Sequence, residues 1–258
     1  MPDGISLCKK RAVLFDLDGT VYYGNKIIPG ANDTITFFRN QGIKVYFATN
    51  NSTKTRRQIF ERLCGMGVDC RLEEVLTSGY LAALYALRRG LKDILIFGSH
   101  NLVEEFESLG VTVSHDGSAE NLLIGYNPDM TYEDLTTAVR VAFSAKRVIA
   151  CNRERTFPGE GAKIFPGCGA MTAPVEWCAN RSCDVIIGKP SPFMIEMVIE
   201  EDGIDASQIL IVGDSYESDI AMAMAAGCDA VLISDSDYDD VQTVASIRDV
   251  PKLVSGTE

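Results

Sequence analysis

The sequence predicts an α/β fold in which a parallel sheet is wound with helices and carries a second, inserted α/β unit. Short apolar runs recur along the chain, each bounded by turn residues and followed by a stretch with helical character. Several runs end in reactive polar residues, and the carboxyl ends of parallel strands are where open α/β sheets place their ligand sites. More than 100 residues separate two of the runs, which is too long for a single crossover connection.

Five apolar runs are predicted as strands of the main sheet: residues 12–15, 44–48, 184–187, 208–212 and 229–233. Helices are predicted over residues 193–200, which follow Pro192, and over residues 220–226, which Gly227 would end. The acidic segment 234–240 is predicted to be a solvated turn.

The long intervening segment has the pattern of a second α/β unit. Its predicted strands are residues 93–97, 121–125 and 147–151, and its predicted helices are residues 80–89, 102–109 and 132–144. The resulting division gives a core of residues 1–78 plus 184–258 and an inserted unit of residues 79–183. Gly167 and Gly169 are interpreted as a turn. Core positions are expected for Trp177 and for the methionines at 194, 197, 222 and 224.

Composition excludes several classes of function. The 258 residues carry a net charge of -12, which repels nucleic acid and anionic membranes. The chain lacks an apolar run near the roughly 20 residues that cross a bilayer. Its eight cysteines form no Cys-x-x-Cys pair, and with only two histidines a structural zinc site is not expected. The first residues lack the apolar stretch of a signal peptide, so a cytoplasmic protein with buried free thiols is expected.

Asp16 and Asp18 directly follow the first predicted strand, and Gly19 comes next. Side chains two residues apart in an extended segment share a face, so two like charges would lie close together. Such a pair favours a divalent metal ion, although Asp-x-Asp-Gly is equally compatible with an ordinary tight turn.

Thr49, Asn50 and Asn51 end the second predicted strand and lead into a predicted helix. A hydroxyl, two amides and free N–H groups at a helix N-terminus form a cradle for an anion. Ordinary N-capping by Ser52 or Thr53 is the alternative, and the two interpretations are compatible.

Lys189, Asp214 and Asp219 complete the set of strand-end residues. Lys189 would supply a fixed positive charge for a phosphate, although a lysine at such a position is usually just solvated. Asp214 is a candidate metal ligand, and Asp219 is either a second acid of the site or a first-turn acid that stabilises the following helix.

These motifs, in this order, resemble those of the haloacid dehalogenase (HAD) superfamily of phosphohydrolases. Asp16-x-Asp18-Gly-Thr, Thr49-Asn-Asn, Gly-Lys189-Pro and Gly-Asp214-x4-Asp219 match its four motifs over nearly the whole chain. The segments after Asp18 and before Gly188 are similar to the NagD-like, or p-nitrophenylphosphatase, subfamily. The resemblance implies a Rossmann-like, doubly wound core with an inserted α/β cap that selects the substrate.

The resemblance also implies a mechanism for a Mg²⁺-dependent phosphatase. Asp16 would be the nucleophile that forms an aspartyl-phosphate, and Asp18 the general acid and base. The metal would be held by Asp16, the backbone carbonyl of Asp18 and Asp214, with Asp219 binding or orienting this shell. Phosphoryl oxygens would be held by Thr49 and Lys189, and the substrate would also meet Gly19, Asn50 and Asn51.

The segments 125–129 and 152–155 depart from the family pattern, so the substrate stays open between sugar phosphates, nucleoside monophosphates and similar metabolites. Arg153 or Arg155 would contact a second anionic group of the substrate or would belong to a solvated loop, and the role of Asn152 stays open. Relatives with this kind of cap often pair through it, so the resemblance makes the chain a candidate for a homodimer through the cap, which the residues themselves do not indicate. The alternatives from other classes are a phospho-accepting signalling domain and a catalytically silent scaffold on the same fold.

Overall fold

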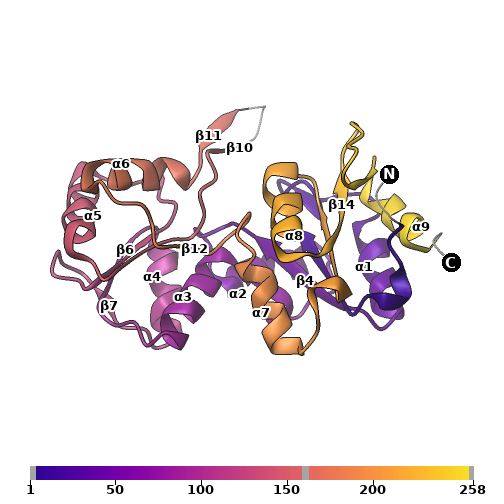
Figure 1. Ribbon diagram of the computed structural model, residues 1–258, viewed down its shortest axis with the longest axis horizontal. Coiled ribbons are helices and arrows are strands. Elements are labelled where there is room, and N and C mark those ends of the chain that lie inside the picture. Colours follow the sequence, from indigo (N-terminus) through magenta and orange to yellow (C-terminus); the bar gives the residue numbers. More distant parts are fainter. Residues whose placement is uncertain (1–3, 159–162, 256–258) are drawn as a thin grey trace. The chain divides into compact units, whose positions relative to one another are not determined.

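The chain folds into two compact units in a computed structural model that describes residues 4–158 and 163–255 (Figure 1). The first unit comprises Met1–Thr49, Phe60–Leu76 and Lys189–Glu258, and the second comprises Asn50–Ile59 and Thr77–Gly188. The predicted core included residues 50–59, 77–78 and 184–188, which the structure assigns to the second unit. Residues 1–3 and 256–258 of the predicted core lie outside the described part of the chain.

The first unit is built on a six-stranded sheet with the order β15-β14-β13-β1-β4-β5. β1 lies in the middle and pairs in parallel with both β13 and β4, so all five of its residues are buried. A strand covered on both faces needs a continuous apolar run, which is the pattern seen in the sequence. The six strands are β1 (Ala12–Asp16), β4 (Lys44–Thr49), β5 (Val75–Thr77), β13 (Ile209–Gly213), β14 (Asp229–Ile233) and β15 (Gln242–Val244).

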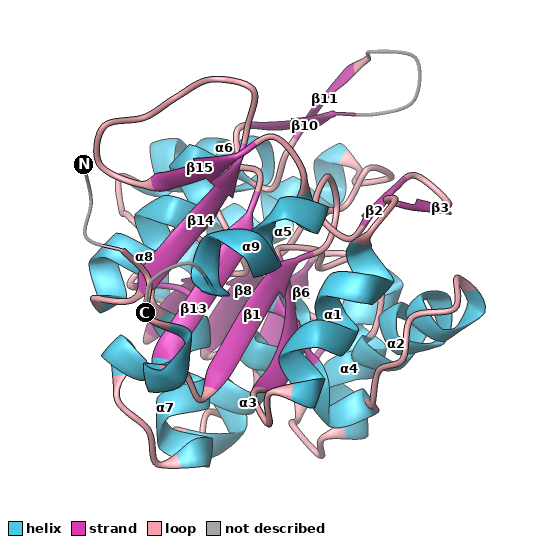
Figure 2. Cartoon of the chain, turned by 90° about the vertical axis from the view of Figure 1, so that its right-hand side faces the viewer, coloured by secondary structure: helices cyan, strands magenta, loops and turns pink. Residues whose placement is uncertain are grey.

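The strand order places a topological switch point between β1 and β13. From β1 the chain moves to β4 and β5 on one side, and it later returns to β13, β14 and β15 on the other. Figure 2 shows β1, β13 and β14 side by side in this sheet. Open α/β sheets bind ligands beyond the carboxyl ends of the strands at such a switch point. That is where Asp16 ends β1 and where Asp214 follows β13.

Helices surround this sheet. α1 (Ala31–Asn40) buries Ala31, Thr34, Ile35 and Phe38, a spacing that makes one face of a helix. A π-helical turn (Tyr216–Ile220) leads into α8 (Ala221–Ala226), which ends at Gly227 with φ 76°, as predicted. The remaining elements of this unit are α7 (Phe193–Asp202), α9 (Val250–Ser255), the hairpin strands β2 (Tyr22–Tyr23) and β3 (Lys26–Ile27), and the 3-10 turns Leu7–Lys9, Leu72–Glu74, Ala206–Gln208 and Ile247–Asp249.

The second unit has its own parallel sheet, with the order β12-β9-β8-β6-β7. The prediction that residues 184–187 belong to the main sheet is wrong, because Val185 and Ile186 form β12 and pair with β9. A short apolar run shows that a strand is present, but not which sheet it joins. The other strands are β6 (Ile94–Phe97), β7 (Val113–Ser114), β8 (Asn121–Ile124) and β9 (Arg147–Ala150). The three strands predicted for the inserted unit are confirmed at β6, β8 and β9.

The helices of the second unit include α3 (Ser78–Arg88), α4 (His100–Ser108), α5 (Tyr132–Ser144) and α6 (Gly169–Ala179). α2 (Arg56–Gly65) begins in the second unit and ends in the first. The short strands β10 (Thr156–Pro158) and β11 (Ile164–Pro166) form an antiparallel ribbon that the sequence did not reveal. Among the described residues, no helix is both long enough and apolar enough to cross a membrane.

Three expectations about burial are corrected. Trp177 is 87% exposed and Met224 is 47% exposed, so neither belongs to the core, whereas the other three methionines of that set are buried as predicted. All eight cysteines are free thiols, but Cys8, Cys64 and Cys178 are exposed. Helical character in a sequence shows that such a residue lies on a helix, but a single residue does not show which face it occupies.

Candidate active site

Three carboxylates meet at the switch point of the main sheet. Asp16, Asp214 and Asp219 each offer an oxygen atom, and these atoms lie within 4.8 Å of one another. Asp219 is 1% exposed, whereas Asp214 is partly exposed. Oxygen ligands at this spacing suit a hard divalent cation such as Mg²⁺. Asp16 and Asp214 were expected to lie together, and the structure brings them together.

Gly19 makes this approach of Asp214 possible. A Cβ atom built on Gly19 would lie 2.0 Å from Oδ2 of Asp214, and the φ of Gly19 is +95°. Only glycine meets both requirements without strain. The N–H of Gly19 donates to the carbonyl of Tyr22 at 2.8 Å. Gly19 therefore leaves room for the Asp214 carboxylate, and its expected contact with the substrate stays a prediction.

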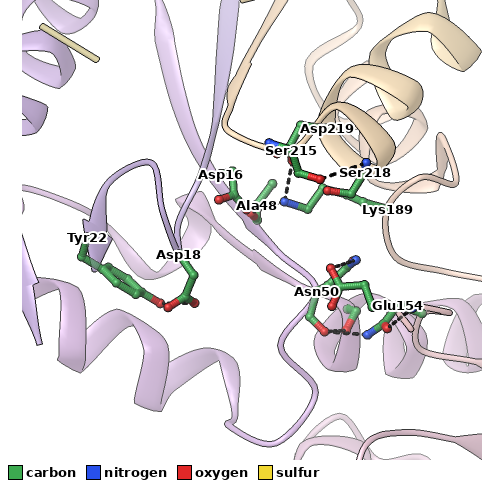
Figure 3. Close-up of polar contacts among 12 residues, drawn as sticks. Asp16, Asp18, Tyr22, Ala48, Asn50, Glu154, Lys189, Ser215, Ser218 and Asp219 are labelled. Carbon is green, nitrogen blue, oxygen red and sulfur yellow. Dashed lines mark hydrogen bonds and ion pairs between the residues drawn. The ribbon is translucent and has the colours of Figure 1, made fainter. Parts of the chain in front are cut away.

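Lys189 lies within this acidic cluster, as Figure 3 shows. Its ammonium group donates to Asp16 Oδ1, to Asp219 Oδ1 at 2.7 Å and to the carbonyl of Ala48 at 3.3 Å. The side chain is buried, so the interpretation of Lys189 as a solvated lysine is wrong. Asp219 is likewise more than a first-turn acid, because its second oxygen accepts the N–H of Ser215 at 3.2 Å.

The electrostatics of the cluster favour an added cation. Three carboxylates and one ammonium leave a formal charge of -2. Burial raises the pKa of Asp16 well above its usual range, with Lys189 opposing this shift. Desolvation raises the pKa of Asp214 to about 6, and the charge of Asp219 adds to the effect. Burial disfavours the charge on Lys189, but Asp16 and Asp219 outweigh it and raise the pKa of the lysine. The carboxylates are thus held close together with too little positive charge to balance them. A divalent ion would supply the missing positive charge.

Asp18 points elsewhere. Its Oδ2 accepts a hydrogen bond from the hydroxyl of Tyr22 at 3.0 Å, and Tyr22 itself is 1% exposed. Desolvation raises the pKa of Asp18, while the Tyr22 hydrogen bond and the charge of Arg62 partly oppose that shift. Sequence reasoning missed both Tyr22 and Arg62. A tyrosine four residues after Asp18 in a tight turn was the only available signal, and nothing in the sequence pointed to Arg62.

Thr49 ends β4 and is 4% exposed. The next residues, Asn50 and Asn51, belong to the second unit. The carbonyl of Asn50 accepts from the hydroxyl of Ser78 and from Nδ2 of Asn152, each at 2.8 Å, and Asn50 Nδ2 donates to Glu154 at 2.9 Å. Asn50 therefore ties this segment to its own unit.

The expected anion cradle at the start of α2 is largely occupied by protein groups. Asn51 Oδ1 accepts the N–H groups of Thr53 and Lys54, each at 3.0 Å. The helix is capped by Thr55, not by Ser52 or Thr53, because Thr55 Oγ1 accepts the N–H of Gln58 at 3.2 Å. The loop is tied to the rest of the second unit by other bonds: Ser52 Oγ accepts the N–H of Tyr126 at 3.1 Å, and the carbonyl of Thr53 accepts from Nδ2 of Asn101 at 2.7 Å.

The departures from the family pattern at residues 152–155 have defined contacts. Asn152 is 2% exposed, and Glu154 is the partner of Asn50. Arg153 forms an ion pair with Glu176 of α6, and Arg155 is exposed. Asn152, whose role the sequence left open, therefore belongs to the interior of the second unit. The guanidinium of Arg153 already has a carboxylate partner.

Comparisons with known proteins agree with this geometry. Residues 13–112 match the family model described as haloacid dehalogenase-like hydrolase, and residues 186–254 match a second model described as HAD-hydrolase-like. The chain is 33% identical over 251 residues to the sugar-phosphatase AraL of Bacillus subtilis, which covers 93% of this chain and 92% of that protein.

Two solved structures are similar to the whole chain. A p-nitrophenyl phosphatase from Archaeoglobus fulgidus has a TM-score of 0.88 and 28% identity, covering 94% of this chain and 98% of its own. A structure described as a nagD protein has a TM-score of 0.87 and 26% identity, covering 99% of this chain and 100% of its own.

Proposed function

Because the chain belongs to the haloacid dehalogenase-like hydrolases and is a NagD-like phosphatase of small phosphate esters, we propose that it acts through Mg²⁺ and a phosphorylated Asp16. The observation that carries this proposal is the cluster in which Asp16, Asp214, Asp219 and Lys189 converge at the switch point of the main sheet. A carboxylate that lies beside an ammonium group and other metal-ligating oxygens is well placed to meet a phosphoryl group.

In the first step, an oxygen of Asp16 attacks phosphorus, and the bond from phosphorus to the ester oxygen breaks. Asp18 gives its proton to the departing alcohol. In the second step Asp18 takes a proton from water, which attacks the phosphorus of the acyl phosphate and releases inorganic phosphate and free Asp16. The raised pKa of Asp18 supports its role as an acid, because a larger fraction of the carboxyl groups then carries the proton that the first step requires.

Asp16, Asp214 and the backbone carbonyl of Asp18 would hold Mg²⁺, and Asp219 would orient this shell. When bound, the ion supplies positive charge against the negative oxygens of the transferring phosphoryl group. Lys189 contributes a second positive charge from the protein itself, and the hydroxyl of Thr49 is proposed to donate to a phosphoryl oxygen. Asn50 and Asn51 are proposed to contribute to substrate binding.

Small phosphorylated metabolites, with sugar phosphates first, are the proposed substrates. The name of the Bacillus subtilis relative, a sugar phosphatase, supports this class. A panel of sugar phosphates and nucleoside monophosphates, assayed for inorganic phosphate and ranked by kcat/KM, tests the assignment. A preference for nucleoside monophosphates over every sugar phosphate would contradict it.

The chemistry is tested on p-nitrophenyl phosphate. We expect turnover with Mg²⁺, loss of turnover in excess EDTA, recovery when Mg²⁺ is returned, and loss in Asp16→Asn. Asp235→Asn is the matched control, because Asp235 is an exposed acid of the 234–240 turn. Full activity in EDTA would refute the metal requirement, and an active Asp16→Asn variant would refute the nucleophile. A phosphorylated protein that persists for hours would favour the signalling alternative.

We propose a cytoplasmic location, supported by the eight cysteines, which are all free thiols. Pairing of two copies through the second unit is the proposed assembly, supported by large exposed apolar side chains on α5 and α6, among them Phe143 and Trp177. Light scattering coupled to size-exclusion chromatography measures the assembly, and a monomer at micromolar concentration would contradict it.

A further inference from the structure

We propose that Tyr22 and Arg62 are positioning residues that orient Asp18 so that the proton of its carboxyl group faces the substrate and not the protein. This inference rests on the proposed acid role of Asp18. It concerns two residues of the first unit that none of the four sequence motifs includes.

The loop after β1 brings Tyr22 back onto Asp18. The carbonyl of Leu17 accepts the N–H groups of Val21 at 2.9 Å and of Tyr22 at 3.0 Å, and the N–H of Gly19 donates to the carbonyl of Tyr22 at 2.8 Å. This closed turn places the phenol beside the carboxyl group, where the hydroxyl donates to Asp18 Oδ2 (Figure 3). The contact is therefore fixed by the backbone and not by a mobile side chain alone.

Arg62 orients the hydroxyl proton of Tyr22. Its Nη1 lies 3.4 Å from the Tyr22 oxygen, and a guanidinium can only donate hydrogen bonds. With an N–H aimed at that oxygen, the hydroxyl proton turns toward Asp18. The Arg62 guanidinium also lies 4.3 Å from the centre of the Tyr22 ring, and its Nη2 donates to the carbonyl of Gly24 at 2.5 Å. Arg62 thus holds both the ring and the β2–β3 hairpin that carries it.

The direction of this hydrogen bond determines where Asp18 keeps its own proton. An oxygen that accepts from Tyr22 is a poor place for the proton, so the proton occupies the other oxygen. Among the residues that the structure describes, the second oxygen of Asp18 has no hydrogen-bond partner. The acid therefore presents its proton from an oxygen that is free to meet the departing alcohol.

The test measures kcat/KM for three phosphate esters of similar shape: p-nitrophenyl, phenyl and benzyl phosphate. Their departing oxygens are increasingly basic in that order and therefore depend increasingly on protonation. In Tyr22→Phe we expect kcat/KM to fall about 10- to 100-fold for benzyl phosphate and less than about threefold for p-nitrophenyl phosphate. In Arg62→Met the loss of kcat/KM should increase in the same order of substrates but should be smaller for each of them. The ratio kcat/KM is used because it reports the steps up to phosphoryl transfer to the protein.

Tyr23→Phe is the matched control, since Tyr23 is the adjacent tyrosine and is 60% exposed. It should behave as the wild type on all three esters. An equal loss on the three esters in Tyr22→Phe would indicate general damage to the fold and would overturn the proposal, as would no loss at all. Failure of the wild-type protein to hydrolyse any of the three with Mg²⁺ would instead refute the proposed function, so the two failures are distinguishable.

Discussion

Replacement of Lys189 by methionine tests how the acidic cluster is held together. In the wild type, the ammonium lies between Asp16 and Asp219, and both carboxylates are buried. Methionine fills a similar volume and removes the charge. Because breaking a buried ion pair leaves uncompensated charge behind, we expect the free energy of unfolding without metal to fall by about 3–5 kcal/mol.

The geometry of the cluster indicates where this loss comes from. Two like charges 4.8 Å apart, the greatest separation between the ligand oxygens, repel each other by about 3.5 kcal/mol at an effective dielectric constant of about 20. Lys189 offsets this repulsion. Asp219→Asn in the Lys189→Met background removes one of the repelling charges and should recover at least about 1 kcal/mol in a double-mutant cycle.

Urea unfolding in EDTA at neutral pH, followed by far-UV circular dichroism, measures these changes. Fluorescence is less suitable, because the sole tryptophan lies in the second unit and is 87% exposed. Turnover of Lys189→Met with Mg²⁺ should also fall by several decades, since one positive charge on the phosphoryl oxygens is lost. A free energy of unfolding within about 0.5 kcal/mol of the wild type, or no recovery in the double variant, would refute the electrostatic account.

Three other predictions follow from single contacts. Gly19→Ala should weaken Mg²⁺ binding, measured by calorimetry, because its Cβ would lie 2.0 Å from a carboxylate oxygen of the cluster, and undiminished affinity would contradict this. Lys10→Met should lower the free energy of unfolding by about 3 kcal/mol and leave KM unchanged, because the ammonium of this buried lysine bonds two backbone carbonyls and an aspartate. The control variant Lys9→Met, at an exposed position, should change the free energy of unfolding little. Burial raises the pKa of Glu105, so the folded protein binds that proton more readily than the unfolded one, and this group's contribution to stability should decline as pH rises from 4.5 through the raised pKa. Glu105→Gln should flatten the pH dependence of the free energy of unfolding above pH 4.5. The control variant Glu107→Gln, at an exposed position, should not, and equal pH profiles for the two variants would contradict the role of Glu105.

The parts of the fold that could be predicted are those fixed by local pattern. Strand β1 has an apolar run covered on both faces, and α8 ends at a glycine with positive φ, so both follow from nearby residues alone. The strand formed by Val185 and Ile186 was assigned to the wrong sheet, because sheet membership depends on a partner far away in the chain. Trp177 was misplaced for a related reason, since the exposed face of α6 is set by what packs on its other side.

The candidate site divides in the same way. Asp16 ends β1 and Asp214 follows β13, so the rule that ligands bind at the carboxyl ends of strands was enough to group these two. Lys189 was grouped with them through a strand that belongs to the other sheet, so only the fold establishes its place in the cluster. The hydrogen bonds of Asn51 with Thr53 and Lys54 could not be foreseen, because a side-chain amide and an external anion compete for the same N–H groups. Arg62 escaped notice because a cation on a helix surface is usually solvated, and only the fold brings it over a tyrosine ring.

The charge of the site also predicts an order of binding. The whole chain carries -12 and the cluster -2, so without a metal ion a phosphate dianion would meet repulsion from both. A divalent cation brings the cluster to a formal charge of zero, and Lys189 is then no longer outnumbered by carboxylates. Inorganic phosphate should therefore bind measurably by calorimetry in Mg²⁺ and at least about tenfold more weakly in EDTA. Asp214→Asn removes one negative charge and one carboxylate oxygen of the cluster, so the affinity for phosphate should rise in EDTA and fall in Mg²⁺. Equal phosphate affinity with and without Mg²⁺ would show that the protein alone supplies the positive charge, and it would contradict this account of how an acidic protein accepts an anionic substrate.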